Sequence, residues 1–229
     1  MQDLPKMTQS PENFRVLELK EKVGIERLGI MSSQVWHDDP QGLLFTLSRY
    51  KFVSSILRDY KNVLEIGCGD GFYSRIVQQK VKKLTLTDHD PIFIEDIRNR
   101  NSENWTVEAK VLNPLNSKVE GLYDGIYFLD VLEHIDKKEE NNFIENSLNA
   151  LDKNGTMIIG MPSLESQEYA SEISKKGHIN CKTGKEFLSL MKNFFDSVNI
   201  FSMNDEVVHT GFWPMSHYLF AVCNLRTYK

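Results

Sequence analysis

Three glycines lie close together in the stretch VLEIGCGDGFYS, directly after a short apolar run. Gly67, Gly69 and Gly71 are spaced as G-x-G-x-G, which allows a tight turn and lets a ligand approach the main chain. A nicotinamide-binding fingerprint would need its third glycine at Phe72, and a P-loop would need Gly-Lys-Ser/Thr after the turn. The spacing therefore predicts a ligand site but fits neither of these phosphate sites.

Carboxylates surround this turn. Glu65 lies inside the apolar run, Asp70 lies in the turn, and Asp88 ends the next apolar run, LTLTD. A carboxylate at the end of that second run can accept hydrogen bonds from both hydroxyls of a ribose. This much acid would repel a pyrophosphate but not a ligand with a cationic centre. The residue types therefore favour a ligand with a cationic centre over one with a pyrophosphate.

A second group of residues that could take part in ligand binding or catalysis lies in the stretch DVLEH. Asp130, Glu133 and His134 are three and four positions apart, so they share one face if the stretch is helical. Carboxylates and an imidazole on one face can hold a divalent cation, and His178 could complete such a set. The same side chains can equally make internal hydrogen bonds. We therefore assign no metal site here and keep these residues as candidates.

The elements that must position these residues follow an alternating pattern after Tyr60. Short apolar runs alternate with helical patterns, which is typical of βαβ units and a largely parallel sheet. The last two runs are joined by residues 204–217, a link with little room for a crossover helix, so these two strands should be antiparallel. Strands are predicted at 62–67, 83–88, 105–112, 123–130, 155–162, 197–203 and 217–224, and helices at 73–79, 91–101, 137–151 and 184–195. The predicted fold class is α/β, with a mostly parallel seven-stranded sheet, a reversed strand near the C-terminus and helices on both faces.

The residues before this pattern predict a helical cap. Apolar spacing indicates helices at 13–28 and 43–57, with a break at 31–42. We divide the chain into a flexible tail and a single domain, which itself has a cap, a ligand-binding core and substrate-side segments with the last two strands. The boundaries are 1–12 for the tail, 13–229 for the domain, 13–60 for the cap, 61–163 for the core and 164–229 for the rest.

Composition excludes several classes of protein. The net charge of −5 argues against a large surface for DNA or RNA. Three scattered cysteines fit neither a disulfide framework nor a zinc ribbon. No apolar run approaches the roughly 20 residues that span a bilayer, and the N-terminus lacks a signal-peptide pattern. We expect a cytoplasmic protein with no membrane or nucleic-acid partner, while its oligomeric state stays open.

Four motifs in order identify a family. The stretches VLEIGCGDG, LTLTDHD, YDGIYFLDVLEHI and LDKNGTMIIGMPS resemble successive motifs of class I S-adenosylmethionine (SAM)-dependent methyltransferases. The two terminal strands resemble the part of the fold that contains the family's reversed seventh strand. The resemblance implies a Rossmann-like fold, SAM as the cofactor and methyl transfer as the activity. The cationic sulfonium of SAM agrees with the acid around the glycine turn.

The resemblance also implies which residues would hold SAM. The backbone of the glycine turn would line the methionine part, and the acid after the second strand would bind the ribose. Asn113 stands where the family often has an aspartate that bonds the adenine amine. The implied cofactor-binding residues are Gly67, Cys68 and Gly69 along the methionine, Glu65 and Asp70 supporting the turn and the amino group, Asp88 at the ribose, His89 and Asn113 at the adenine, Leu129 and Asp130 over the methionine end, and Arg49 and Tyr50 at the carboxylate.

Methyl transfer from SAM is an in-line displacement in which the enzyme mainly aligns the acceptor. A general base helps where the acceptor is a hydroxyl. The links after the fifth strand and before the last strand carry the candidate bases, His178 first and His209 second. The small size, the acidic charge and the polar and aromatic residues of these links favour a small polar acceptor. We expect a hydroxyl or an amine, first of all on a sugar or a sugar nucleotide.

Two alternatives remain open at this level. The acceptor could be RNA or another macromolecule, because relatives that methylate small-RNA 3′ ends or ubiquinone precursors use an E-x-x-E-H version of the DVLEH stretch to hold a metal. In this chain Asp130 replaces the first glutamate, and Glu133 and His134 match the rest. The chain could also be a non-catalytic SAM-binding protein, because fold and function can separate.

Overall fold

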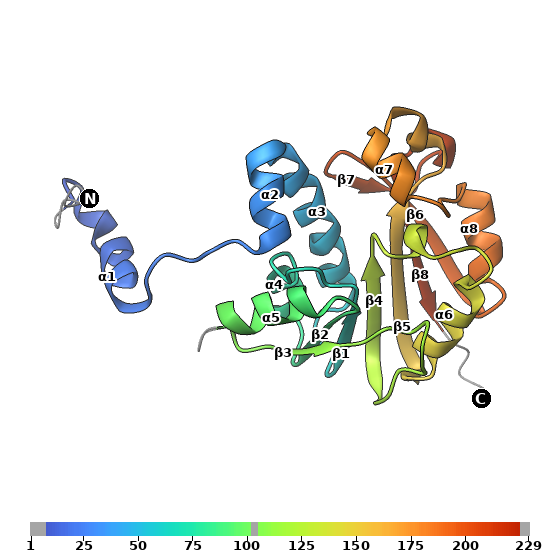
Figure 1. The fold of residues 1–229 in the computed structure, drawn as a ribbon, viewed down its shortest axis with the longest axis horizontal. Helices are drawn as coiled ribbons and strands as arrows, with labels where there is room; N and C mark the ends of the chain where they lie inside the picture. Colours follow the sequence, from blue (N-terminus) through green and yellow to red (C-terminus); the bar gives the residue numbers. More distant parts are fainter. Residues whose placement is uncertain (1–7, 102–104, 225–229) are drawn as a thin grey trace.

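Eight strands form one sheet in the order β3-β2-β1-β4-β5-β8-β6-β7 (Figure 1). The computed structural model describes residues 8–101 and 105–224 of the chain. The first five strands in the sequence are mutually parallel, and β8 pairs antiparallel with both β5 and β6. The strands are β1 (Val63–Ile66), β2 (Leu84–Asp88), β3 (Glu108–Val111), β4 (Tyr123–Leu129), β5 (Leu151–Pro162), β6 (Ser197–Asn204), β7 (Val207–His209) and β8 (Tyr218–Asn224).

The predicted parallel sheet with a reversed strand near the C-terminus is confirmed, but the predicted strand count of seven was too low. The additional strand is β7, which forms a hairpin with β6 inside the link that the sequence presented as a loop. Asp205 adopts a left-handed φ of 50° at the turn, and Val207 and Val208 then supply two β-branched residues that favour a strand.

Helices cover both faces of the sheet. Successive side chains of β4 point to opposite sides: Ile126 and Phe128 join one hydrophobic cluster, and Tyr127 and Leu129 join the other. Helices α6 and α8 pack on the first cluster, and α3 and α5 pack on the second. The helices and 3-10 helices (η) are η1 (Pro11–Asn13), α1 (Phe14–Val23), α2 (Ile30–Asp38), α3 (Pro40–Ile56), α4 (Arg75–Gln78), α5 (Pro91–Arg100), η3 (Leu132–His134), α6 (Glu140–Leu148), η4 (Glu165–Tyr169), α7 (Glu172–Gly177), α8 (Gly184–Met191) and η5 (Trp213–Met215).

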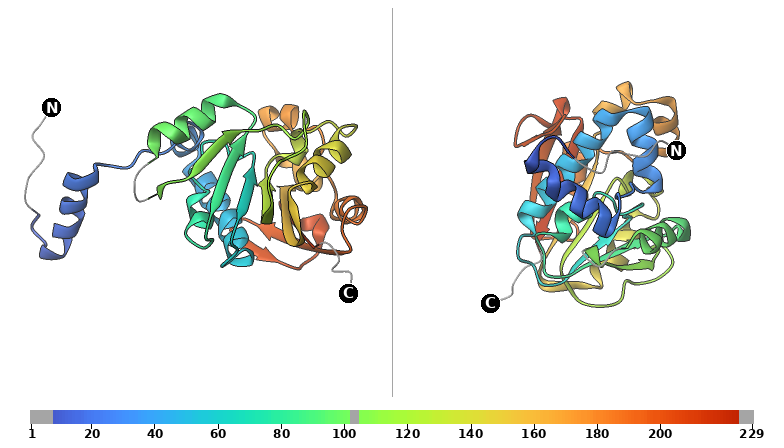
Figure 2. Two further views of the ribbon diagram at one scale, coloured as in Figure 1. Left: turned by 90° about the horizontal axis from the view of Figure 1, so that it is seen from below. Right: turned by 90° about the vertical axis from the view of Figure 1, so that its left-hand side faces the viewer.

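The N-terminal cap differs from the prediction in two places. Figure 2 shows α1 extended away from the body, and none of its residues is buried. The helix ends at Gly24, whose φ of 81° cannot continue it. The predicted break at 31–42 was wrong, since α2 occupies most of it and Pro40 opens α3 directly after it. Of the predicted tail 1–12, residues 1–7 lie outside the described residues.

The carboxyl ends of β1, β2, β4 and β5 meet at one edge of the sheet, at the top of Figure 1. Helices α2 and α7 and the β6–β7 hairpin lie above this edge (Figure 1). Strand order reverses between β1 and β4, which is where open α/β sheets place ligands. In residues 8–101 and 105–224, no helix is both long and apolar enough to cross a membrane.

Candidate active site

The glycine turn after β1 has a backbone that other residues could not adopt without strain. Gly67 and Gly69 have left-handed φ values of 75° and 52°. A Cβ on Gly67 would lie 2.3 Å from a methyl carbon of Val131, and one on Gly69 would lie 2.8 Å from the sulfur of Met31. Both glycines line a cavity, so their missing side chains leave the main chain open to a ligand.

Asp88 fixes this turn at the end of β2. One carboxylate oxygen accepts from the backbone N–H of Gly69 and the other from that of Asp90, both at 2.9 Å. Asp88 as a whole residue is 5% exposed, and it lines the same cavity. Each carboxylate oxygen keeps a further lone pair that can accept a hydroxyl hydrogen. The exposed ring of His89 lies 3.3 Å from Asp88 and completes this wall.

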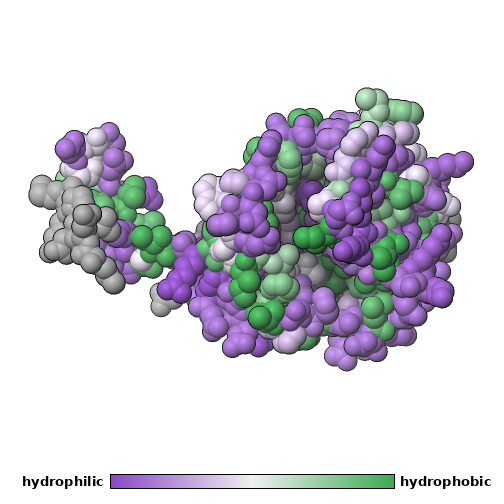
Figure 3. All heavy atoms as spheres, turned by 45° about the horizontal axis from the view of Figure 1, so that its top comes forward, coloured by the Kyte–Doolittle hydropathy of each residue, from purple (hydrophilic) through white to green (hydrophobic). Residues whose placement is uncertain are grey.

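The cavity has a volume of about 410 Å³ and opens at the carboxyl edge of the sheet. This volume lies in the usual range for small-molecule sites. Figure 3 looks obliquely onto this edge, where the surface of the body is hollowed. The wall runs from the glycine turn and Asp88 to Asn113 on one side and to Asp130 and His134 on the other. One cavity therefore joins the predicted nucleoside site to the DVLEH stretch.

Several residues expected at the cofactor do not line this cavity. Glu65 is 1% exposed, and its two oxygens accept hydrogen bonds from the hydroxyls of Tyr50 at 2.7 Å and Tyr127 at 2.5 Å. Burial raises the pKa of Glu65 to about 6, although both tyrosine hydroxyls oppose this shift. Cys68 and Leu129 are also buried and are absent from the wall. These side chains support the turn from behind.

Asp70 supports the cap. Its carboxylate accepts from the backbone N–H of Ser32 at 2.7 Å and from the Ser32 hydroxyl at 3.1 Å, so it satisfies the first turn of α2. It also accepts from the N–H of Phe72. Asn113 does line the cavity, but its side-chain oxygen accepts from the N–H of Leu115. Both side chains therefore already accept hydrogen bonds from other residues of the protein.

Arg49 reaches Asp130 from α3. One guanidinium nitrogen lies 2.9 Å and 2.8 Å from the two carboxylate oxygens, and the guanidinium stacks 4.0 Å from the ring centre of Tyr218. Asp130 has a left-handed φ of 56°, an unusual conformation for a non-glycine residue. Arg49 therefore holds Asp130 in a strained turn, and Asp130 does not join the other residues of DVLEH.

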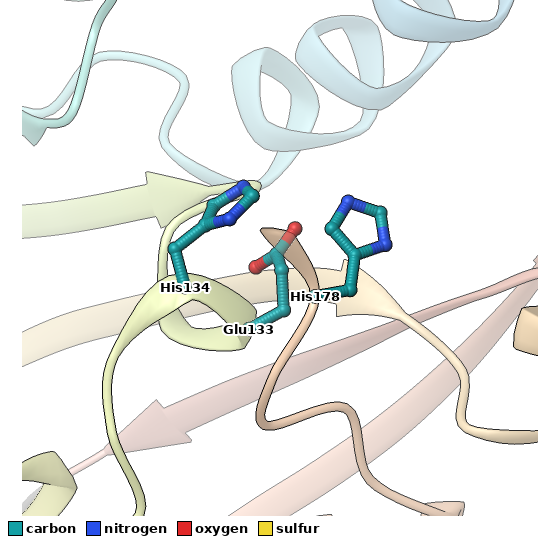
Figure 4. A group of neighbouring side chains, drawn as sticks. All are labelled: Glu133, His134 and His178. Carbon is teal, nitrogen blue, oxygen red and sulfur yellow. The ribbon is translucent and has the colours of Figure 1, made fainter. Parts of the chain in front are cut away.

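Glu133, His134 and His178 come together instead. The expected helical face is absent, because Asp130 has a left-handed backbone and only the short η3 follows it, which contains Glu133 and His134. His178 arrives from the end of α7, and one ligand atom from each of the three residues lies within 4.8 Å of the others. Figure 4 shows the carboxylate of Glu133 lying between the two imidazole rings.

The Glu133 carboxylate is buried without a partner. Its residue is 0% exposed, and neither side-chain oxygen has a hydrogen bond among the described residues. Burial and the nearby charge of Asp130 raise its pKa well above the ordinary value. Such a group is costly unless a cation or a donor compensates it. Two imidazoles and a carboxylate are the donor set of many open catalytic metal sites, so these residues fit a divalent transition-metal ion.

The two predicted base candidates differ in their surroundings. Burial and the neighbouring His134 lower the pKa of His178, which favours the neutral imidazole that a metal requires. His209 lies in β7, where one ring nitrogen contacts the Asn204 side chain and the other accepts from the N–H of Gly211, both at 2.9 Å. It does not line the cavity. His178 therefore joins Glu133 and His134 in one cluster, and His209 supports the hairpin.

Sequence reasoning missed the tyrosines that organise this region. Tyr127 holds Glu65 from within β4, and Tyr218 supports Arg49 from the start of β8. Met31 lines the cavity from α2, in residues that looked like a break. No local pattern distinguishes these apolar or aromatic positions from ordinary core residues.

Comparisons with known proteins agree with this geometry. A family model described as a methyltransferase domain matches residues 36–194. The mitochondrial ubiquinone biosynthesis O-methyltransferase of Schizosaccharomyces pombe is 24% identical over 126 residues, which are 51% of this chain and 45% of that protein. The match therefore spans less than half of that relative's length.

Solved structures share the fold. The N-methyltransferase NodS from Bradyrhizobium japonicum WM9, in complex with S-adenosyl-L-homocysteine, superposes with a TM-score of 0.60 at 18% identity, over 84% of this chain and 91% of that one. The methyltransferase domain of bacterial CtHen1 superposes with a TM-score of 0.64 at 18% identity, over 79% of this chain and all of that one.

Proposed function

The chain belongs to the class I SAM-dependent methyltransferase family, and on that premise we propose that it methylates a hydroxyl oxygen of a small polar acceptor with the help of a divalent cation. The observation that carries this proposal is the buried Glu133 carboxylate, which has no hydrogen-bond partner among the described residues and lies between two imidazoles (Figure 4). The printed name of the ubiquinone O-methyltransferase, which specifies transfer to oxygen, supports the same choice of acceptor atom.

The donor side would be formed by the glycine turn and Asp88. SAM supplies a methyl group on a sulfonium, which is already a strong electrophile. Gly67 and Gly69 would admit it to the main chain, and the free lone pairs of Asp88 would accept the ribose hydroxyls. The acid of this wall suits a cation and would disfavour a pyrophosphate.

The acceptor side would begin where the donor cavity ends. His134 lines that cavity and also belongs to the three-residue cluster, so the two sites share one side chain. A bound divalent cation would lower the pKa of an acceptor hydroxyl and orient it. Glu133, His134 and His178 would hold that cation, while Arg49 keeps Asp130 turned aside. The protein's main contribution is then alignment of the oxygen with the methyl group.

A sugar or sugar nucleotide remains the first candidate acceptor. Aromatic side chains are exposed on α2, which lines the cavity through Met31, and on η4, which contacts His178: Trp36 is 59% exposed and Tyr169 is 85% exposed. Aromatic faces of this kind pack against the apolar faces of sugar rings. An RNA acceptor would use the same cation chemistry, but the net charge of −5 offers no broad surface for phosphates.

Calorimetry with SAM tests the donor side. Wild type and the remote Asp59→Ala variant should bind SAM alike, and Asp88→Ala should lose most of the affinity. Equal SAM binding by wild type and Asp88→Ala, or none by wild type, would overturn the donor site.

Radiolabelled SAM tests the acceptor side, with sugars, sugar nucleotides, amines and an RNA oligonucleotide offered with Mn²⁺, Zn²⁺ or EDTA. We expect transfer to a hydroxyl that stops in EDTA and returns with one of the metals. Methyl transfer to an amine at a rate that EDTA does not change would contradict both the proposed oxygen acceptor and the proposed role of a cation. Transfer to RNA alone would favour the macromolecular alternative.

A further inference from the structure

Both histidines of the cluster are hydrogen-bonded through the same ring nitrogen. The Nδ1 atom of His134 lies 2.9 Å from the backbone carbonyl oxygen of Gly177, the last residue of α7. A carbonyl oxygen only accepts, so Nδ1 of His134 must carry the hydrogen. Nε2 is therefore the ring nitrogen that is left available as a ligand.

His178 has the same arrangement with a side chain in place of the carbonyl. Its Nδ1 lies 2.8 Å from the amide oxygen of Gln167, in η4. The orientation of that amide is set by its nitrogen, which lies 3.3 Å from both the Ser163 carbonyl oxygen and the Ser166 hydroxyl. A flipped amide would bring two carbonyl oxygens together, so the oxygen faces His178. Nδ1 of His178 is then the donor, and Nε2 keeps its lone pair.

The partners of both rings come from the segment between β5 and α8. The same segment contacts the third member of the cluster, since the N–H of Asn180 donates to the backbone carbonyl of Glu133 at 3.0 Å. Asn180 is in turn fixed by the buried pair of Lys182 and Glu140, whose charged atoms are 2.7 Å apart. The segment is therefore tied down on both sides of His178.

We propose that Gln167 is a positioning residue, which fixes the tautomer and orientation of His178 so that Nε2 is the atom presented to a cation beside Glu133. A neutral histidine free in water favours the opposite tautomer, with the hydrogen on Nε2. Histidine ligands commonly donate their other N–H to an oxygen that sets the ring. Gln167 supplies that oxygen without adding a negative charge next to the buried Glu133 and Asp130. This inference deepens the proposed function and rests on it for the identity of the ligand.

Two substitutions of Gln167 separate positioning from packing. Gln167→Leu keeps the approximate size and removes the acceptor, whereas Gln167→Glu keeps an acceptor oxygen. Glu168→Leu, at the exposed neighbouring position, is the matched control. Nitrogen-15 NMR of the imidazoles in the metal-free protein reports the tautomer of His178 directly, and the melting temperature of each variant reports folding.

We expect His178 to be protonated on Nδ1 in wild type, Gln167→Glu and Glu168→Leu, and to shift toward the Nε2-protonated form in Gln167→Leu. Titration with Co²⁺, followed by its visible spectrum, should show affinity lower by about 10- to 100-fold in Gln167→Leu. Gln167→Glu should restore most of that affinity. SAM binding should be unchanged in all variants.

An unchanged His178 tautomer in a folded Gln167→Leu protein would overturn the proposal. So would an equal loss of Co²⁺ affinity in Gln167→Glu and Gln167→Leu, because the acceptor oxygen would then be irrelevant. If wild-type protein binds no Co²⁺, Zn²⁺ or Mn²⁺, the cation-dependent part of the proposed function is wrong. The NMR result alone would still decide whether Gln167 sets the tautomer of His178.

Discussion

Glu65 and Glu133 are both buried glutamates near the carboxyl ends of neighbouring strands, and the protein treats them in opposite ways. Glu65 is 1% exposed, and a tyrosine hydroxyl donates to each of its oxygens. Glu133 is 0% exposed, and neither of its oxygens has a hydrogen-bond partner among the described residues. Burial is the main cause that raises the pKa of each: to about 6 for Glu65, and well above the ordinary value for Glu133.

The difference indicates that Glu65 stabilises the fold, whereas Glu133 is available for a ligand. The tyrosines around Glu65 complete its hydrogen bonds from α3 and β4, so this carboxylate ties the cap to the sheet. The oxygens of Glu133 are instead accompanied by two imidazoles, and one ligand atom from each of the three side chains lies within 4.8 Å of the others. A buried carboxylate without a partner lowers the stability of the folded protein. A ligand that binds to the carboxylate would restore that free energy, which is the simplest reason for such a residue to be present.

The largest expected effect is on stability, from removal of the satisfied glutamate. Glu65→Leu leaves the hydroxyls of Tyr50 and Tyr127 buried without an acceptor, at about 1–3 kcal/mol each. We expect the free energy of unfolding to fall by about 2–4 kcal/mol in urea denaturation, since loss of the buried charge offsets part of the cost. Glu65→Gln keeps one acceptor oxygen and should lose much less. A Glu65→Leu protein as stable as wild type would break the comparison.

Removal of the unsatisfied glutamate should act on activity. Even an outer partner of a metal ligand contributes about 10- to 100-fold, so Glu133→Gln should reduce metal-dependent turnover by more than about 100-fold. Its free energy of unfolding without metal should stay within about 1 kcal/mol of wild type, because an amide of the same size replaces a carboxyl group that makes no hydrogen bond with the described residues. Initial rates with radiolabelled SAM and urea denaturation measure the two effects. Full activity with reduced stability would reverse the assignment of Glu133.

Added metal should sharpen the same contrast. A cation that binds only the folded protein at 100 times its Kd raises the free energy of unfolding by about 2.7 kcal/mol. We expect Zn²⁺ or Co²⁺ to raise the melting temperature of wild type and of Glu65→Gln, but not that of Glu133→Gln. Mg²⁺ serves as a control, because two imidazoles suit it poorly. Equal stabilisation of all three proteins would place the metal elsewhere.

The smallest effect is a pH dependence of the metal-free protein. The pKa of Glu65 is raised from 4.5 to about 6 on folding, so the native state binds more protons than the unfolded state between these values. Its contribution to stability is therefore complete below pH 4.5 and is lost as the pH rises to 6, by about 2 kcal/mol.

Denaturation profiles of variants isolate each glutamate. The difference between wild type and Glu65→Gln should change over this window and level off above pH 6. The corresponding difference for Glu133→Gln should have the same sign, since burial and the nearby Asp130 raise the pKa of Glu133 as well. A difference of the opposite sign for either variant would contradict the raised pKa of that carboxyl group.

The sequence predicted the sheet well because its signals are local. Apolar runs such as VLEIG and LTLTD have the length and composition of buried strands, and the glycine turn follows from residues within a few positions of one another. The same reasoning missed β7 and α2. Strand β7 forms by pairing with β6. The first turn of α2 donates a backbone hydrogen bond to Asp70, which comes much later in the chain.

The roles of the acidic residues were harder to foresee. Glu65, Asp70 and Asp88 all surround the glycine turn in the sequence, yet only Asp88 lines the cavity. Asp130 and Glu133 are three positions apart, yet one pairs with Arg49 and the other lies with His178. Nothing in their spacing distinguishes them, because their partners arrive from α3, β4 and α7.

The sequence by itself determined the parallel core of this protein and the family to which it belongs: the order of β1 to β5, the tight glycine turn and the acid that follows the second strand. These features depend on the conformational preferences of neighbouring residues. Only the tertiary structure decided which buried polar groups are satisfied and which are left for a ligand. That outcome depends on hydrogen-bond partners that are distant in the chain, and a carboxylate alone in the sequence does not reveal whether a tyrosine or two imidazoles will meet it.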